Sequence, residues 1–329
     1  DKISKRSEFL MNEFELIKNY FQKLTKKNPS ALKLNDDVFF DKNKKIVISV
    51  DTYNEGYHYL NFKNPYLVIK KIIRSSISDL YCKGVTPKYI FISGSGDKKH
   101  FSIKNLKLIS KSIKEEQKKF NILLSGGDTV NSKKSSFSVT TLGYSKKIVK
   151  RNMTNLGDDI YVTGNLGDSY IGLNILKKKI TISKKMNNYF IRKYYKPDLP
   201  VNIHSYLCKF ATSSLDISDG LISDLKKLIN EQKFGFNLFI NKLPISKNLH
   251  FYLIKNNKKI VNYVSRGDDY QIIFSSSKKN RSYIKNLSKR INQKITLIGT
   301  ITNQSNQYRI INNGKYLKSL NYQGYLHKF

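Results

Sequence analysis

The sequence predicts a folded protein of mixed α/β class with two domains. Short β-branched runs alternate with longer segments whose apolar residues repeat at helical spacing. The chain has 329 residues, of which 39% are hydrophobic, and this length favours two domains at roughly 100–200 residues each. We expect an N-terminal domain over residues 1–148 and a C-terminal domain over residues 149–329, because a polar, basic stretch at 146–156 separates the two halves.

The first half is expected to contain three helices and three strands. Apolar residues from Leu10 to Phe21 recur at helical spacing and predict a helix over residues 8–23. The β-branched run from Ile46 to Val50 predicts a strand that ends at Asp51. The other elements are helices over 65–82 and 102–118 and strands over 122–124 and 137–144.

The second half opens with a strand over residues 160–163, a glycine-rich turn from Gly164 to Ser169, and a helix that continues to Leu176. This order can bring a phosphate to the unpaired amides of a helix N-terminus, although any tight turn of this kind also favours glycine. Further helices are expected near 184–195, 202–211, 220–232, 246–256 and 279–291, and strands near 236–240, 271–275, 295–300 and 308–312.

The charge is strongly positive, with 60 Lys and Arg against 24 Asp and Glu. Such a balance is typical of proteins that meet nucleic acid, anionic membranes or phosphorylated substrates. The cations are scattered along the whole chain and accompany many Asn, Ile and Tyr residues, so we interpret them as surface composition and expect no nucleic-acid partner. A basic nucleic-acid-binding protein without catalysis is the alternative from another class.

Other features favour a cytoplasmic protein without a membrane partner. No run approaches the roughly 18 to 20 apolar residues that span a bilayer. The two cysteines, Cys82 and Cys208, are too few for a disulfide framework or a structural zinc site and suit a reducing compartment. The histidines form no HExxH pattern, and neither a Gly-x-Ser-x-Gly elbow nor a Walker A sequence is present.

The acids are few and clustered, and they predict a site that binds divalent cations. Three adjacent Asp pairs occur, at 36–37, 158–159 and 268–269, where chance predicts roughly one. Other aspartates stand at strand ends and glycine-flanked turns, and Mg²⁺ is usually shared between such carboxylates and substrate phosphates. Each acid also has a structural interpretation, since Asp219 could cap a helix that starts near Leu221 and Asp128 could close a turn after Gly127.

Taken in order, the short motifs of the chain resemble the thiamine-monophosphate kinase family. The resemblance covers nearly the whole chain and is carried by Asn35-Asp36-Asp37, Val50-Asp51-Thr52, Ile77-Ser78-Asp79-Leu80, Gly126-Gly127-Asp128-Thr129, Arg151, Asp216-Ile217-Ser218-Asp219-Gly220, Gly267-Asp268-Asp269-Tyr270 and Tyr322-Gln323-Gly324-Tyr325. It implies the two-domain fold of aminoimidazole ribonucleotide synthetase, with an α/β N-terminal domain whose sheet pairs across a homodimer and an α+β C-terminal domain. It also implies ATP-dependent, magnesium-assisted phosphorylation of thiamine monophosphate to thiamine diphosphate.

The same resemblance assigns roles to individual positions. The implied magnesium ligands are Asp37, Ser49, Val50, Asp51, Asp79, Asp128, Asp216 and Asp219. Catalysis would rest on Asp51, Asp79, Asp128 and Arg151, and ATP would be held by Gly127, Asp128, Arg151 and Ser218. His58, Asp268 and Tyr322 would contact the thiamine substrate.

The chain departs from the family pattern near the nucleotide and substrate positions. The family usually has Gly-Ile-Gly before the Asp-Asp pair, where this chain has Lys33-Leu34-Asn35. The family's Gly-Gly-Glu-Asp-Tyr-Glu motif reads Arg266-Gly267-Asp268-Asp269-Tyr270-Gln271 here, so Asp268 replaces a Glu. Asn131 replaces a frequent Arg, and Tyr322 replaces a frequent Trp. The metal carboxylates are kept, so the departures concern substrate affinity.

Relatives with the same fold and another acceptor are the alternative: aminoimidazole ribonucleotide synthetase, selenophosphate synthetase and a hydrogenase-maturation ATPase. Selenophosphate synthetase usually has a catalytic Cys or selenocysteine near its N-terminus, whereas the first Cys here is Cys82. The maturation protein ends in a functional Cys, whereas this sequence ends with Tyr325-Leu326-His327-Lys328-Phe329.

Overall fold

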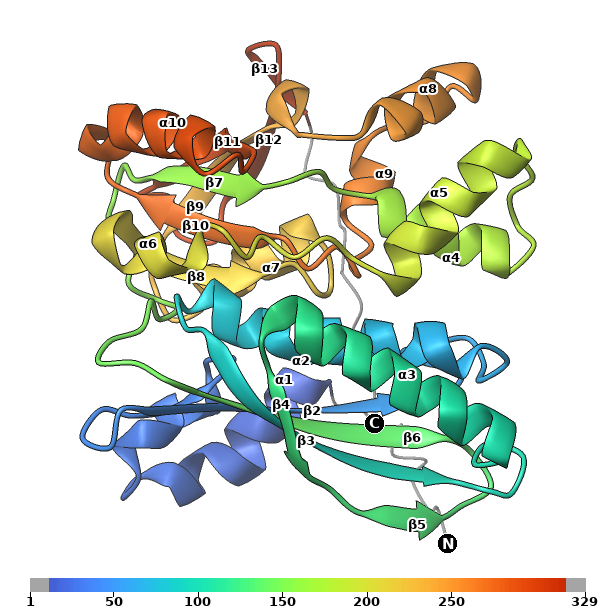
Figure 1. Cartoon of the computed structure of the whole chain (residues 1–329). Coiled ribbons are helices and arrows are strands. Elements are labelled where there is room, and N and C mark those ends of the chain that lie inside the picture. The colour runs from blue at the N-terminus through green and yellow to red at the C-terminus, as the bar shows by residue number, and fades with distance from the viewer. Residues whose placement is uncertain (1–11, 318–329) are drawn as a thin grey trace, which may run out of the picture.

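The computed structural model describes residues 12–317, which form two β-sheets with helices packed on them (Figure 1). The first sheet has the strand order β1-β2-β6-β3-β4, with β5 paired to β3. Its strands are β1 (Phe39–Asp41), β2 (Ile46–Asn54), β3 (Pro87–Gly96), β4 (Leu123–Gly126), β5 (Thr129–Asn131) and β6 (Ser136–Tyr144). Helices α2 (Pro65–Cys82) and α3 (Ile103–Phe120) lie on one face of this sheet (Figure 1).

Helix α2 lies between the first sheet and the second half of the chain (Figure 1). It starts where the Asn64 side chain accepts a hydrogen bond from the Leu67 amide, with Pro65 in the first turn. It ends at Cys82 with Lys83 as the cap, and the chain then turns away at Gly84, whose φ of +79° suits glycine and where an added Cβ would lie 3.1 Å from Cys208 Sγ. Because both sides of the helix are covered, even its cationic residues Lys70, Lys71 and Arg74 are buried.

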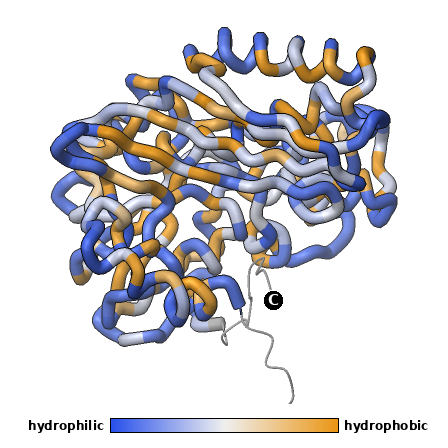
Figure 2. Tube along the Cα trace, turned by 90° about the horizontal axis from the view of Figure 1, so that it is seen from below, coloured by the Kyte–Doolittle hydropathy of each residue, from blue (hydrophilic) through white to orange (hydrophobic). Residues whose placement is uncertain are grey.

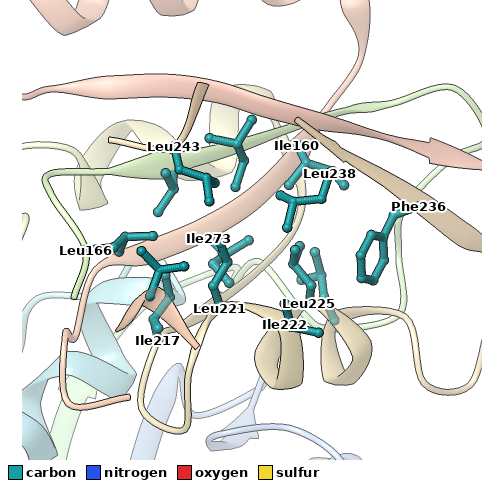
Figure 3. Packing of buried hydrophobic residues seen from close by; sticks show 14 of the residues in the cluster. Ile160, Leu166, Ile217, Leu221, Ile222, Leu225, Phe236, Leu238, Leu243 and Ile273 are labelled. Atoms are coloured by element: carbon teal, nitrogen blue, oxygen red, sulfur yellow. The ribbon is translucent and has the colours of Figure 1, made fainter. Parts of the chain in front are cut away.

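The second sheet has the order β13-β12-β9-β11-β7-β10-β8. Its strands are β7 (Asp159–Thr163), β8 (Ala211–Asp216), β9 (Gly235–Phe239), β10 (Ile272–Ser276), β11 (Ile295–Thr302), β12 (Tyr308–Asn312) and β13 (Lys315–Leu317). The helices of this half are α4 (Asp168–Leu176), α5 (Lys184–Tyr195), α6 (His204–Phe210), α7 (Leu221–Leu228), α8 (Lys247–Lys255), α9 (Val261–Val264) and α10 (Arg281–Arg290). Figure 3 shows the apolar core in which Leu221 and Leu225 of α7 approach Ile160 and Ile273.

The predicted N-terminal helix is only partly correct. Residues 8–11 lie outside the described residues, and the rest forms α1 (Glu13–Leu16), a π-helical turn over Ile17–Phe21 and a 3₁₀ turn over Gln22–Thr25. None of these residues is fully buried. Phe14 and Ile17 line a cleft, so the apolar spacing marks a cleft wall and not a helix packed on a core.

The strand prediction for 46–50 was too short, and five strands were missed, namely the short strands β1, β5 and β13 and the longer strands β3 and β8. β2 continues to Asn54, because Tyr53 and Asn54 pair with Phe137 and Ser136 of β6. The Gly-Ser ending of β3 and the Ser-rich sequence of β8 have weak β-propensity. Both strands form because antiparallel neighbours, β6 and β10, supply their hydrogen bonds.

The face of the first sheet opposite α2 and α3 carries apolar rows. Val50 is 67% exposed and lies in register with Thr140, which is itself opposite Phe91. Leu124 and Val130 of the edge strands are also exposed, and Figure 2, a view from below, shows hydrophobic segments along these strands. No helix among residues 12–317 is long and apolar enough to cross a bilayer.

Candidate active site

A cleft of about 1160 Å³ collects residues from distant parts of the sequence. Most of the residues singled out from the sequence line it: Asp37, Val50, Asp51, His58, Asp79, Arg151, Asp216, Ser218, Asp219 and Asp268. The remaining walls come from the N-terminal segment around Phe14 and from Tyr170 and Leu173 of α4. The cleft is thus built from the end of β2, from α2, from the end of β8 and from the turn that precedes β10.

The carboxylates of Asp51 in β2, Asp79 in α2 and Asp216 in β8 meet in the cleft. They are largely removed from bulk water. Removal from bulk water raises the pKa of both Asp51 and Asp216 to about 6. The pKa of Asp79 rises well above its usual value, first through burial and then through the negative charges of Asp51 and Asp216. The three carboxylates repel one another, which is an arrangement that a bound cation would relieve.

Hydroxyl groups support these carboxylates. Ser78 Oγ donates to Asp216 Oδ2 at 2.8 Å, and the Tyr53 hydroxyl donates to Asp51 Oδ2 at 3.2 Å. Ser49 is buried on the same face of β2 as Asp51 and partly offsets the raised pKa of Asp79 by hydrogen bonding. Val50 points to the opposite face of the strand, as period-two alternation requires.

Asp36 and Asp37 are neutralised by the chain itself. Lys83 Nζ lies 2.7 Å from Asp36 Oδ1 and 2.6 Å from Asp37 Oδ2. The Arg151 guanidinium forms an ion pair with Asp37, and the Arg151 amide donates to Asp36 Oδ2 at 3.0 Å. Burial lowers the pKa of Lys83, but the charge of Asp36 more than offsets this, so the pKa is raised and the lysine is charged.

Asp219 does not cap helix α7, so that structural interpretation was wrong. The cap position is Gly220 with φ +117°, and the carboxylate that accepts from the amides of Asp219 and Gly220 belongs to Asp224, each at 3.0 Å. Asp219 instead forms an ion pair with Lys227, which also lies 2.8 Å from Asp224 Oδ1. Lys227 therefore holds Asp219 at the cleft.

The turn before β10 brings Asp268 to the cleft. Gly267 has φ +81°, and a Cβ there would lie 2.2 Å from the carbonyl oxygen of Ser218, so only glycine fits this close approach. The Asp268 amide donates to that carbonyl at 2.8 Å. His58 lines the cleft beside Tyr53, with ring centroids 5.7 Å apart. Tyr322 lies outside the described residues.

Gly127 and Asp128 do not line this cleft. They connect β4 to β5, and Asp128 Oδ1 accepts from the Thr129 amide at 2.7 Å, which is the turn contact that the sequence allowed. β4 is the third strand from β2 in the sheet, so its backbone lies about 14 Å from that of Asp51 at roughly 4.8 Å per strand. Asp128 and Asp51 of one chain are too far apart to share an ion.

Three cationic residues of the site were missed by sequence reasoning. Lys71 and Lys83 contact Asp268 and the Asp36-Asp37 pair, and Lys227 contacts Asp219. One signal in the sequence could have revealed two of them. Lys71 lies inside the apolar segment predicted as a buried helix and Lys83 directly follows it, and an unpaired cation in such a place is costly.

Among residues 12–317, no group of three or more His, Cys, Asp or Glu side chains is arranged so that it could hold a metal ion. Mg²⁺ usually keeps several waters and binds through one or two carboxylates together with substrate phosphates. The crowded carboxylates of Asp51, Asp79 and Asp216, with their raised pKa values, fit that kind of shared site.

The chain is similar to known proteins over most of its length. Residues 33–145 match the AIR synthase related protein, N-terminal domain. The chain is 35% identical over 314 residues to a thiamine-monophosphate kinase of Buchnera aphidicola subsp. Acyrthosiphon pisum, with 92% of this chain and 95% of the relative covered. A second relative of that name, from Buchnera aphidicola subsp. Schizaphis graminum, is 36% identical over 318 residues, with 92% and 95% covered.

Among solved structures, AaThiL complexed with AMPPCP and TMP superimposes with a TM-score of 0.82 at 26% identity, covering 96% of this chain and 97% of that one. The expected aminoimidazole ribonucleotide synthetase-like fold is therefore confirmed. With one third of its residues identical to curated relatives over almost their whole length, the chain belongs to the thiamine-monophosphate kinase family.

Proposed function

We propose that the chain transfers the γ-phosphate of ATP to the phosphate of thiamine monophosphate, giving thiamine diphosphate and ADP. The observation that carries this proposal is the group of poorly solvated carboxylates, Asp51, Asp79 and Asp216, in one cleft with Arg151. The membership of the family and the likeness to a structure that holds AMPPCP, an ATP analogue, and TMP support the choice of substrates.

In this reaction the nucleophile is already an anionic phosphate oxygen, so no strong base is needed and charge repulsion is the main obstacle. Magnesium, when bound, would neutralise the phosphates and the charge that develops in transfer. Asp51, Asp79 and Asp216 would hold it, with Ser49, the backbone carbonyl of Val50 and Asp219 as further ligands. Asp37, the remaining ligand that the resemblance implies at this cleft, is already paired with Lys83 and Arg151. Arg151, which forms an ion pair with Asp37, lines the same cleft as Ser218. Both residues would contact the ATP phosphates.

The thiamine end would lie towards His58 and Asp268. A carboxylate and two aromatic rings, Tyr53 and Tyr270, line this part of the cleft and suit a cationic heterocycle by charge and by cation–π contact. Tyr322 would add a further ring by family position.

The direct test is incubation of the protein with ATP, Mg²⁺ and thiamine monophosphate, followed by separation of thiamine diphosphate. Excess chelator should stop the reaction, and Asp79→Asn should lower kcat by several orders of magnitude because a carboxamide keeps the shape and loses the charge. Asp41→Asn, on β1 outside the cleft lining, is the matched control. Product formed in chelator, or an active Asp79→Asn, would refute the proposed role of the metal.

We also propose that the protein is a cytoplasmic homodimer. Its open sheet face, with Val50, Phe91, Leu124 and Val130 exposed, is the kind of apolar surface that a partner covers. Both cysteines are free, which suits a reducing compartment. Because Asp128 lies three strands away from Asp51, we propose that Gly127 and Asp128 act in the cleft of the partner chain.

A further inference from the structure

Lys83 is a buried cation whose hydrogen-bonding capacity is fully used. It follows the last turn of α2 and is 0% exposed. Its Nζ lies 2.7 Å from Asp36 Oδ1, 2.6 Å from Asp37 Oδ2 and 2.7 Å from the carbonyl oxygen of Ser214 on β8. An ammonium group carries three protons, so each proton has one acceptor. Lys83 is therefore a fixed charge and is not available as a base or a nucleophile.

The two aspartates transmit this fixed position to Arg151. Asp36 Oδ1 also accepts from the Asp37 amide at 2.9 Å, and Asp36 Oδ2 accepts from the Arg151 amide at 3.0 Å. Asp37 forms an ion pair with the Arg151 side chain. One connected set of contacts thus runs from Ser214 through Lys83 and the aspartate pair to the arginine that lines the cleft.

Asp51, Asp79 and Asp216 have no such partner. Among the described residues, no Lys, Arg or His forms an ion pair with Asp51, Asp79 or Asp216, whereas Asp219 pairs with Lys227 and Asp268 with Lys71. The charges of Lys83 and Arg151 attract Asp79 and Asp216 from a distance, but burial still raises the pKa of these carboxyls and of Asp51. The acidic cluster is therefore divided into a part that the chain neutralises itself and a part that needs an added cation.

We propose that Lys83 is a positioning residue that acts as a built-in cation: it holds Asp36 and Asp37 in place of an inorganic ion and thereby fixes Arg151 in the cleft. Divalent ions are then directed to Asp51, Asp79 and Asp216. This proposal relies on the proposed function only for the choice of a divalent ion as the probe.

The test is Mn²⁺ binding by the nucleotide-free protein, measured by electron paramagnetic resonance or calorimetry. Lys83→Met keeps the length of the side chain and removes its charge. The Asp36-Asp37 pair should then need an inorganic ion, so Mn²⁺ should bind about 10-fold more tightly or at one additional site. Mn²⁺ should also raise the Tm of Lys83→Met by several degrees more than that of the wild type. Lys88→Met, on β3 outside the cleft lining, should match the wild type.

Kinetics give a second readout. Misplacement of Arg151 should lower kcat by about 10-fold or more, while the KM for thiamine monophosphate changes little. If Mn²⁺ binding and the Tm response of Lys83→Met equal those of the wild type, Lys83 is not a built-in cation. Because Mn²⁺ binding is measured without ATP or thiamine monophosphate, this failure is distinguishable from a failure of the kinase assay.

Lys83→Met leaves two buried carboxylates without their cation, and the variant alone could be too unstable to purify. The double variant Lys83→Met/Asp36→Asn removes one anion together with the cation and should recover folding, with a Tm above that of the single variant. A double variant no more stable than Lys83→Met would overturn the proposal, because the loss would then come from packing and not from charge.

Discussion

Lys71 Nζ lies 2.5 Å from Asp268 Oδ1, and this ion pair joins helix α2 to the turn before β10 behind the cleft wall. The ammonium also lies over the ring of Tyr194, 4.2 Å from its centroid, and the Tyr270 hydroxyl donates to the same carboxylate oxygen at 3.1 Å. The Lys71 side chain is 2% exposed and that of Asp268 is 27% exposed, so the carboxylate alone faces the cleft.

This pair should control the affinity for the thiamine substrate. Asp268→Asn removes the charge that faces a cationic ring and should raise the KM for thiamine monophosphate by about 10-fold, with little change in the KM for ATP. Lys71→Met should weaken folding, because it leaves the Asp268 carboxylate without its cation. Lys63→Met, at an exposed lysine outside the cleft lining, is the control for this variant. Steady-state kinetics check the first expectation and thermal unfolding the second. An equal rise in both KM values for Asp268→Asn would place this residue outside substrate recognition.

Magnesium should stabilise the nucleotide-free protein more at neutral than at acidic pH. Burial raises the pKa of Asp51 and Asp216 to about 6 from 3.8. A carboxyl with a raised pKa holds its proton more tightly in the folded chain, so its contribution to stability is complete below pH 3.8 and is lost as the pH rises through about 6. Added Mg²⁺ should therefore raise the Tm by several degrees more at about pH 7.5 than at about pH 5.

Asp51→Asn provides the control, because it removes one of the titrating groups and should reduce the difference between the two pH values. Identical Mg²⁺ effects on the Tm at both pH values would contradict the assignment of the ion to these carboxylates.

The proposed role of Asp128 in a partner's cleft predicts complementation between inactive variants. Asp79→Asn and Asp128→Asn should each be inactive alone. In a mixture of equal amounts after subunit exchange, half of the dimers are hybrids, and each hybrid has one cleft that combines an intact Asp79 with an intact Asp128. About a quarter of the wild-type activity should return.

Asp79→Asn mixed with Asp216→Asn is the matched control, since both residues line the same cleft and no hybrid restores it. If the first mixture stays as inactive as this control, Asp128 acts within its own chain or not at all.

The sequence predicted the helices and the acidic residues of the cleft better than it predicted which strands pair and which side chains contact the acids. Helix α2 was placed at 65–82 and observed at Pro65–Cys82, because apolar periodicity is local. β8 was missed, since Ser213 and Ser214 have little β-propensity and the strand depends on β10, more than fifty residues further along the chain. Lys83 was missed for the same reason: its role depends on Asp36 and Ser214, which only the tertiary structure brings together.

The backbone before the Asp36-Asp37 pair is left-handed, and of its residues only Lys33 stands where the family's Gly-Ile-Gly pattern has a glycine. Lys33 and Leu34 have φ values of +58° and +54°, a left-handed conformation that costs a residue with a side chain about 1–2 kcal/mol. Leu34 is 41% exposed, so little packing opposes its replacement. Leu34→Gly should keep or raise the Tm, because relief of strain offsets the greater entropy of glycine in the unfolded chain. Leu34→Val should lower the Tm, since a β-branched side chain is least suited to positive φ. A Tm that falls equally in both variants would mean that the Leu34 side chain stabilises the loop by packing.

The last prediction concerns Tyr322, which lies outside the described residues and is assigned to the substrate by resemblance alone. If its ring stacks on the cationic thiazolium, Tyr322→Ala should raise the KM for thiamine monophosphate by about 10-fold or more and leave the KM for ATP nearly unchanged. Tyr322→Trp should keep or improve the affinity, because indole is the stronger cation–π partner. Tyr316→Ala, at an exposed tyrosine in β13, controls for the loss of an aromatic side chain near this end of the chain. A variant that affects both substrates equally would assign Tyr322 to structure, and the thiamine ring would then be recognised from the His58 and Asp268 side of the cleft alone.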